Sequence, residues 1–169
     1  MAYKFLTYEE KEEIGILTLN RPEKRNALGI EFEKEIISCL KDAGERCDAK
    51  IIILKAAGDI FCAGHDRSEI LDRPLSEIRR LFQTSFNLMT AIRNAPQCII
   101  AQVHGVAMAG GCHLVAGCDL ITAGEEKAKF GMTGLIYSYN CTTPTVAVSR
   151  AVPQKKCMEM LMTAGLYSA

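Results

Sequence analysis

The spacing of apolar residues predicts an alternation of helices and strands along this chain. Residues 30–46 and 75–93 place apolar side chains three or four positions apart, as in Phe32, Ile36 and Leu40, which is typical of amphipathic helices. Strands are predicted at 4–8, 14–19, 50–54, 98–103 and 120–122, and shorter helices at 113–118, 147–152 and 154–163. This alternation of elements predicts an α/β fold.

Three segments allow finer predictions. The acidic run 9–13 is expected to form a solvated turn between the first two strands. The continuous apolar run 51–54 is expected of a strand that is covered on both faces. Residues 105–111 have small side chains and are predicted to form a flexible connection.

Composition and charge narrow the class of protein. The chain has 169 residues, of which 49% are hydrophobic, and 20 basic residues balance 20 acidic ones. This length predicts one domain over residues 1–169. A net charge near zero argues against a nucleic-acid partner or a polybasic membrane contact, and no apolar run is long enough to span a membrane. Because the first residues are charged, we expect no secretory signal and a cytoplasmic location.

The eight cysteines do not predict disulfides or a metal site. They include no CxxC pair and lie mostly among apolar residues, where free cysteine behaves as a small hydrophobic side chain. Cys112, His113 and Cys118 do not provide the four closely spaced ligands of a structural zinc site.

Two loops built of small residues could carry chemistry. Residues 61–66 and 104–113 each follow a predicted buried strand and are rich in Gly and Ala. Such turns let a ligand approach the backbone and leave N–H groups free at a helix start. Two of them could converge on one oxygen atom as an oxyanion hole. The alternative is that the glycines serve only close packing.

Several short motifs occur together in one order. They are NRP at 20–22, NAL at 26–28, FCAGHD at 61–66, GVAMAGGCHL at 105–114, CDL at 118–120, KFG at 129–131 and MEML at 158–161. With these motifs the chain resembles the enoyl-CoA hydratase/isomerase (crotonase) superfamily from about Ile14 to its last residue.

The resemblance implies a crotonase-like spiral of repeated ββα turns, with two sheets surrounded by helices. In that family a helical C-terminal region begins near the position where this sequence stops, so the resemblance implies that this region is missing. Without it, apolar surface is expected to be exposed, which favours self-association. The family also implies a homo-oligomer, either a trimer or a dimer of trimers.

The resemblance further implies an acyl-CoA thioester as ligand, a place in fatty acid metabolism, and no covalently bound cofactor. Two backbone N–H groups hold the thioester oxygen in the family, and they correspond here to His65 and Gly110. The residues that correspond to coenzyme A contacts are Lys24, Arg25, Asp66, Arg67 and Ser68. For each of the cations among them, the alternative is a solvated surface charge.

The sequence departs from the family at its two catalytic glutamates. The corresponding positions are occupied by His113 and Gly134. His113 could act as a base, or it could be a partly buried polar residue that closes an inert pocket. The hypotheses are therefore a lyase or isomerase with an altered catalytic pair, a non-catalytic acyl-CoA-binding protein, and a scaffold subunit of a hetero-oligomer. If the rest of the pocket is intact, restoring both glutamates is expected to create hydratase activity.

Overall fold

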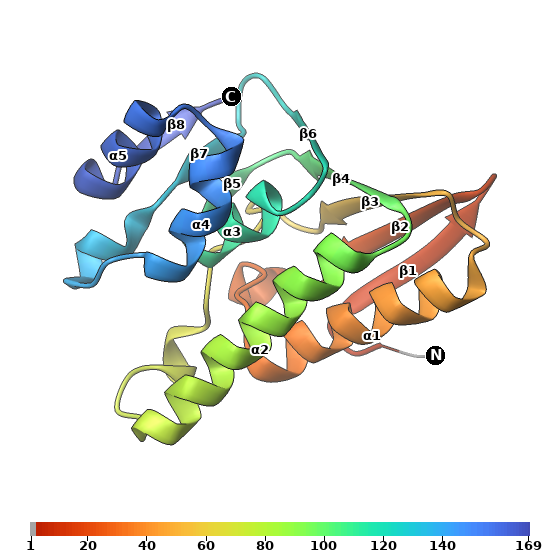
Figure 1. The fold of residues 1–169 in the computed structure, drawn as a ribbon, viewed down its shortest axis with the longest axis horizontal. Helices are drawn as coiled ribbons and strands as arrows, with labels where there is room; N and C mark the ends of the chain where they lie inside the picture. Colours follow the sequence, from red (N-terminus) through yellow and green to blue (C-terminus); the bar gives the residue numbers. More distant parts are fainter. Residues whose placement is uncertain (1–2) are drawn as a thin grey trace.

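The computed structural model describes residues 3–169, which form two β-sheets and five α-helices (Figure 1). The larger sheet has the strand order β1-β2-β3-β4-β6, and the smaller sheet has the order β5-β7-β8. The strands are β1 (Leu6–Lys11), β2 (Ile14–Leu19), β3 (Ile51–Ala56), β4 (Cys98–Val103), β5 (Val106–Met108), β6 (Leu120–Ala123), β7 (Lys129–Gly131) and β8 (Leu166–Ser168). The helices are α1 (Ile30–Arg46), α2 (Leu75–Asn94), α3 (Gly110–Ala116), α4 (Thr142–Ala151) and α5 (Gln154–Thr163).

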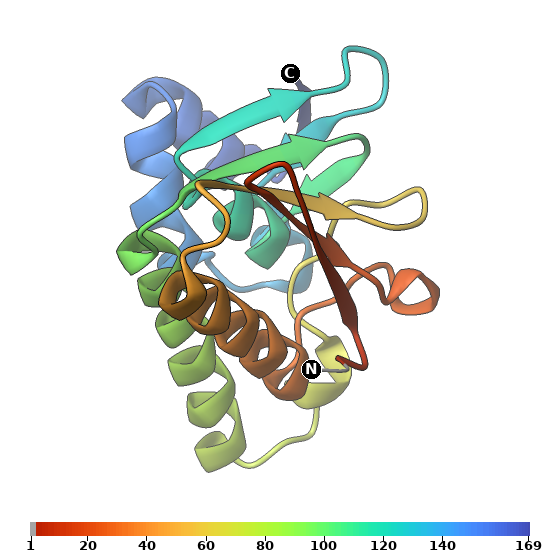
Figure 2. The ribbon, with the colours of Figure 1, turned by 90° about the vertical axis from the view of Figure 1, so that its right-hand side faces the viewer.

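Parallel pairing organises the larger sheet. β1 and β2 form an antiparallel hairpin, and β2, β3, β4 and β6 then pair in parallel. Parallel neighbours need crossover connections, and α1 and α2 provide two of them. These two helices lie side by side along one face of the sheet (Figure 2). The loops that follow β3 and β4 therefore emerge at the same edge of the sheet.

Two groups of buried residues hold these layers together. The larger group lies between α1, α2 and the five-stranded sheet and includes Phe32, Ile36, Ile52, Leu88 and Ile99. The smaller group joins α3, α4 and α5 to the loop after β7; it consists of Cys112, Met132, Cys141, Val148, Cys157, Met160 and Leu161. All eight cysteines are free.

The structure confirms the α/β class and most of the predicted elements. α1, β2, β4 and α5 have the predicted bounds, and α2 is one residue longer than predicted. α3 begins at Gly110 rather than at residue 113, because a Gly-Gly pair weakens the helical pattern. α4 begins at Thr142 rather than at 147, since a proline is tolerated in the first turn of a helix.

Three finer predictions were wrong. Glu9 and Glu10 lie within β1 rather than in the turn, because an edge strand can carry charged side chains that face solvent. β3 is buried on one face only, since the opposite face is incompletely covered within residues 3–169, and Ile51 remains 36% exposed. Residues 105–111 contain β5 and the start of α3 instead of a flexible connection.

Two three-residue strands, β7 and β8, were not predicted. β7 pairs with both β5 and β8 in the smaller sheet. Three residues are too few to show a strand periodicity, so these strands are recognised only by their pairing in the folded structure.

Asn26 ties the segment before α1 to the loop after β3. Its side chain is fully buried, and its Oδ1 accepts a hydrogen bond from the N–H of Arg21 at 2.9 Å. Its Nδ2 donates to the carbonyl oxygens of Ala57 at 2.9 Å and Ile60 at 3.0 Å. One amide side chain therefore fixes the start of the 61–66 loop.

Replacing this amide should be costly. We expect Asn26→Ala to lower the free energy of unfolding by about 2–4 kcal/mol, because three backbone groups lose their partner in a buried place. Urea denaturation measures the change. Asn87→Ala, on the exposed face of α2, is the control and should leave stability nearly unchanged. Equal losses for the two variants would contradict the anchoring role of Asn26.

Candidate functional site

The loop after β3 and the segment from β5 into α3 are joined backbone to backbone. The N–H of Cys62 donates to the carbonyl oxygen of Val106 at 3.1 Å, and the N–H of Met108 donates to the carbonyl oxygen of Cys62 at 3.0 Å. The two loops that the sequence singled out therefore meet, as the convergence hypothesis requires.

Glycines permit this close approach. Gly64 has a φ of +89°, and a Cβ placed on it would lie 3.0 Å from the backbone nitrogen of Gly110. A Cβ on Gly111 would overlap the carbonyl oxygen of Cys62. Any larger residue at either position would push the two loops apart.

The backbone nitrogens of His65 and Gly110 lie at this junction. Within residues 3–169, neither group donates a hydrogen bond to a backbone or side-chain acceptor. A Cβ on Gly110 would lie 3.3 Å from the backbone nitrogen of His65, so the two residues are in contact. Two unpaired N–H donors at one junction can both donate to a ligand oxygen that lies between them.

Ala109 sets the direction of the second N–H group. Its φ of +48° and ψ of −115° are rare for a residue with a Cβ. This conformation is held because its own N–H donates to the carbonyl oxygen of Gly131 at 2.8 Å, and its carbonyl oxygen accepts from the N–H of His113 at 3.0 Å. Strain of this kind costs about 1–3 kcal/mol and is often found at functional sites.

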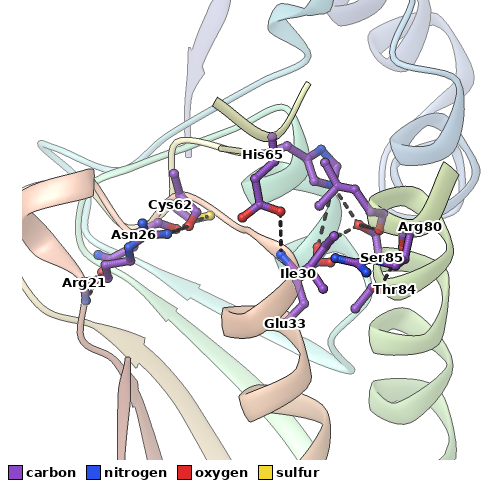
Figure 3. Close-up of polar contacts among 12 residues, drawn as sticks. Arg21, Asn26, Ile30, Glu33, Cys62, His65, Arg80, Thr84 and Ser85 are labelled. Carbon is purple, nitrogen blue, oxygen red and sulfur yellow. Dashed lines mark hydrogen bonds and ion pairs between the residues drawn. The ribbon is translucent and has the colours of Figure 1, made fainter. Parts of the chain in front are cut away.

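The side chain of His65 belongs to a buried polar cluster. Its Nε2 lies 2.8 Å from the Oγ of Ser85, which donates to Oε1 of Glu33 at 2.7 Å. Figure 3 shows Glu33 on α1 and Ser85 on α2 pointing toward each other beside His65. The imidazole also packs edge-on against Phe82, with ring centroids 5.3 Å apart.

Burial shifts the protonation of this cluster toward neutral forms. Desolvation raises the pKa of the Glu33 carboxyl to about 8, although the hydrogen bond from Ser85 opposes the shift. Desolvation also lowers the pKa of the His65 imidazole to about 4. At pH 7 both side chains are therefore mainly uncharged.

Sequence reasoning missed Glu33 and Ser85. Both occupy the apolar stripe of their helix: Glu33 is three residues before Ile36, and Ser85 is four residues after Leu81. A carboxylate and a hydroxyl on the apolar stripes of two helices could have indicated a buried polar contact, because buried polar groups need partners.

His113 lies on α3 and is only 6% exposed. It lines a cavity of about 340 Å³ between α2, α3 and α4, whose walls include Met89 and Val146. Desolvation, and secondarily the nearby His65, lower the pKa of His113 to about 4. The ring is therefore neutral at pH 7 and in the protonation state that a base requires.

Gly134 has no room for a side chain. A Cβ there would lie 2.5 Å from the Sγ of Cys141 and 2.7 Å from the carbonyl oxygen of Tyr139. The thiol already accepts a hydrogen bond from the N–H of Gly134 at 3.2 Å. Restoring glutamate at this position therefore requires the backbone to move, so it is not the simple restoration that the sequence suggested.

The predicted coenzyme A contacts lie in different environments. Lys24 is the last residue of the 3₁₀-helix Pro22–Lys24, Arg25 follows it, and both are exposed. Arg67, in the 3₁₀-helix Arg67–Glu69, packs its guanidinium 4.2 Å from the ring centroid of Tyr137. The carboxylate of Asp66 accepts from the N–H and hydroxyl of Ser68.

Asp66 also pairs with a cation, since its Oδ2 lies 3.3 Å from the guanidinium of Arg21. Burial raises the pKa of this carboxyl, but the hydrogen bonds from Ser68 and the charge of Arg21 together lower it below its usual value. Asp66 and Ser68 therefore serve the local structure first.

Residues 3–169 contain no group of three or more His, Cys, Asp or Glu side chains that could hold a metal ion. In the same part of the chain, no helix has the length and apolar character needed to cross a membrane.

Comparison with known proteins places the chain in one family. The sequence profile of the Enoyl-CoA hydratase/isomerase family matches residues 9–169. The chain is 39% identical to the mouse Enoyl-CoA hydratase domain-containing protein 3, mitochondrial, over 95% of its length and 53% of that protein. It is 40% identical to the human protein of the same name, over 90% of its length and 50% of that protein.

Solved structures match the fold. An enoyl-CoA hydratase of Mycobacterium smegmatis superposes with a TM-score of 0.94 at 37% identity, over 99% of this chain and 65% of that one. Human enoyl-CoA hydratase domain-containing protein 3 gives the same TM-score at 36% identity, over 98% and 66%. These matches confirm the crotonase-like fold, and the chain spans about half the length of the curated relatives described above.

The packing around Gly134 yields a direct prediction. We expect Gly134→Ala to lower the free energy of unfolding by about 1–3 kcal/mol, because the methyl group displaces Cys141 or the backbone at Tyr139. Thermal denaturation followed by circular dichroism measures the effect. Gly124→Ala is the matched control, since a Cβ there meets nothing closer than 3.8 Å. A Gly134→Ala variant as stable as the control would show that the segment around Gly134 can move to admit a side chain, which would contradict the lack of space inferred here.

Proposed function

Because the chain belongs to the enoyl-CoA hydratase/isomerase family, we propose that it binds an acyl-CoA thioester at the junction of its two glycine-rich loops. The observation that supports this most directly is the contact between Gly64 and Gly110, beside two backbone N–H groups without protein acceptors. A thioester oxygen is an acceptor of the right size for this junction.

In this proposal the N–H groups of His65 and Gly110 hold the thioester oxygen. They would stabilise negative charge as the thioester becomes an enolate, and one such donor is typically worth about 3–4 kcal/mol in the transition state. The donors are backbone groups, so no metal ion and no covalently bound cofactor is needed for this step.

Three cations are proposed to bind the phosphates of coenzyme A. Lys24 and Arg25 carry solvated charges beside the loop after β2, and Arg67 is held against Tyr137 next to the first donor loop. Cations attract phosphate oxygens through charge-assisted hydrogen bonds. Asp66 and Ser68 would keep Arg67 in place by capping its 3₁₀-helix.

We propose that hydration is not the reaction. The resemblance aligns His113 and Gly134 with the two catalytic glutamates of the family, and the packing around Gly134 leaves no space for a larger side chain. Enolate formation without hydration is therefore the proposed chemistry, within a lyase- or isomerase-related fold. The second candidate is a non-catalytic acyl-CoA-binding protein or scaffold subunit, which the closed packing around Gly134 favours.

The domain bounds, the oligomeric state and the cellular location of the chain are also proposals. We propose that residues 1–169 act as one acyl-CoA-binding unit. We also propose that the chain forms a homo-oligomer, either a trimer or a dimer of trimers. Leu120 and Ile121 on β6 are largely exposed and could take part in such contacts. A cytoplasmic role in fatty acid metabolism remains the prediction, whereas the names of the mouse and human relatives place those proteins in mitochondria.

Calorimetric titration with acetyl-CoA tests the proposed site. We expect saturable binding at micromolar concentrations and at least roughly tenfold weaker binding by Gly64→Ala, a loss of about 1.4 kcal/mol. The added methyl group would lie 3.0 Å from the Gly110 nitrogen and shield its N–H group.

Gly124→Ala is the control, because its methyl group has room: the nearest atoms are the carbonyl oxygen of Val103 at 3.8 Å and the Cα of His104 at 3.9 Å. A folded wild-type chain that does not bind acetyl-CoA would refute the proposed function. Equal affinities of wild type and Gly64→Ala would show that the thioester binds elsewhere.

A further inference from the structure

A buried chain of three polar side chains ends at the proposed thioester site. It runs from Glu33 on α1 through Ser85 on α2 to Nε2 of His65, with contacts of 2.7 Å and 2.8 Å. Glu33 is fully buried, and its second oxygen, Oε2, has no hydrogen-bond partner among residues 3–169. A carboxyl group in such a place gains little for folding.

The free end of this chain borders the two donor N–H groups. Nδ1 and Cε1 of His65 each lie 3.1 Å from the position that a Cβ on Gly110 would occupy. Nδ1 makes no hydrogen bond to any other side chain within residues 3–169. The one unused nitrogen of the ring therefore lies at the same place as the proposed oxyanion donors.

The hydrogen bonds define how this chain can carry a proton. The Oγ of Ser85 lies 2.7 Å from Oε1 of Glu33 and 3.1 Å from the carbonyl oxygen of Leu81. When Glu33 is ionised, Oε1 can only accept, so the hydroxyl of Ser85 donates to it and Nε2 of His65 donates to Oγ of Ser85. In this state Glu33 is ionised and Nδ1 of the neutral imidazole carries a free lone pair. Nδ1 can then accept a proton.

We propose that His65 exchanges a proton with the α-carbon of the acyl-CoA thioester through Nδ1, and that Glu33 and Ser85 are positioning residues which take up the displaced proton. The proposal rests on the acyl-CoA site proposed above. In the family two glutamates correspond to His113 and Gly134. The proposal gives the role of the base to His65 instead.

The step is balanced. The α-carbon–hydrogen bond breaks, its proton binds to Nδ1, and its electron pair becomes the enolate, whose oxygen lies between the N–H groups of His65 and Gly110. The Nε2 proton moves to Oγ of Ser85, and the hydroxyl proton moves to Oε1 of Glu33. The imidazole stays neutral throughout, and the negative charge moves from Glu33 to the enolate.

Burial of the cluster agrees with such a relay. Desolvation opposes an imidazolium at His65 and raises the pKa of Glu33 to about 8. The charge of Glu69 also raises the pKa of Glu33. Two further titratable groups feel the cluster: Glu33 raises the pKa of the buried Cys62 thiol, and His65 lowers the pKa of His113. Since the base form needs ionised Glu33, proton abstraction should accelerate as the pH rises through about 8.

Hydrogen–deuterium exchange at the methyl group of acetyl-CoA in D₂O tests this proposal. After subtraction of the rate without protein, we expect the wild-type chain to catalyse exchange that rises with pH. Glu33→Gln, Ser85→Ala and His65→Gln should each lower that rate by about 10²-fold or more. Acetyl-CoA affinity should stay within about twofold, because the two oxyanion donors are backbone groups.

Matched controls separate the relay from general damage to the helices. Glu31→Gln changes an exposed carboxylate on α1. Thr84→Ala removes from α2 a hydroxyl that bonds only to the backbone oxygen of Arg80. Both variants should exchange at the wild-type rate. Absence of acetyl-CoA binding by wild type would overturn the proposed site, whereas binding with an exchange rate that Glu33→Gln leaves unchanged would overturn the relay alone.

Nitrogen NMR of the His65 ring provides a readout without ligand. We expect neutral tautomers only, with a change from Nδ1–H to Nε2–H as the pH rises from 7 to 9, and no such change in Glu33→Gln. Titration of His65 as an imidazolium near its ordinary pKa would overturn the relay.

Discussion

The structure depends on one close approach between two stretches of backbone. Gly64 and Gly111 lack side chains where any Cβ would press on the neighbouring loop. This contact brings the backbone nitrogens of His65 and Gly110 to one junction. Ala109, just before Gly110, is held in a rare conformation by hydrogen bonds to Gly131 and His113. The sheet and its helices supply the rigid frame, and the chemistry follows from the fit between these two loops.

Polar groups buried next to this junction could also transfer a proton. Between α1 and α2, the side chains of Glu33 and Ser85 meet His65 beside an otherwise largely apolar core. Desolvation lowers the pKa of the His65 imidazole, so when Glu33 is ionised one proton can move along the cluster to Glu33 without creating a buried cation. Electrostatic stabilisation by backbone donors and proton exchange by a side chain can thus occur at the same residue.

The sequence predicted much of this arrangement, and the limits have physical reasons. Periodicity predicted the long helices and several strands, and the small residues of 61–66 and 104–113 marked the two loops that meet. The choice of His65 and Gly110 within these loops came from the resemblance to the family and stays a prediction. Three-residue strands such as β7 leave no periodic signal. The lack of space around Gly134 depends on Cys141, seven residues away, and the partners of His65 lie on two separate helices. Such contacts arise only from tertiary packing.

The central claim is that the two backbone N–H groups polarise a thioester carbonyl. Infrared difference spectroscopy of acetyl-CoA labelled with carbon-13 at the carbonyl tests this claim most directly. We expect the carbonyl stretch to shift to lower frequency when the chain binds, because two hydrogen bonds weaken the C=O bond, and to shift less with Gly64→Ala. Saturable binding with an unshifted carbonyl band would contradict it.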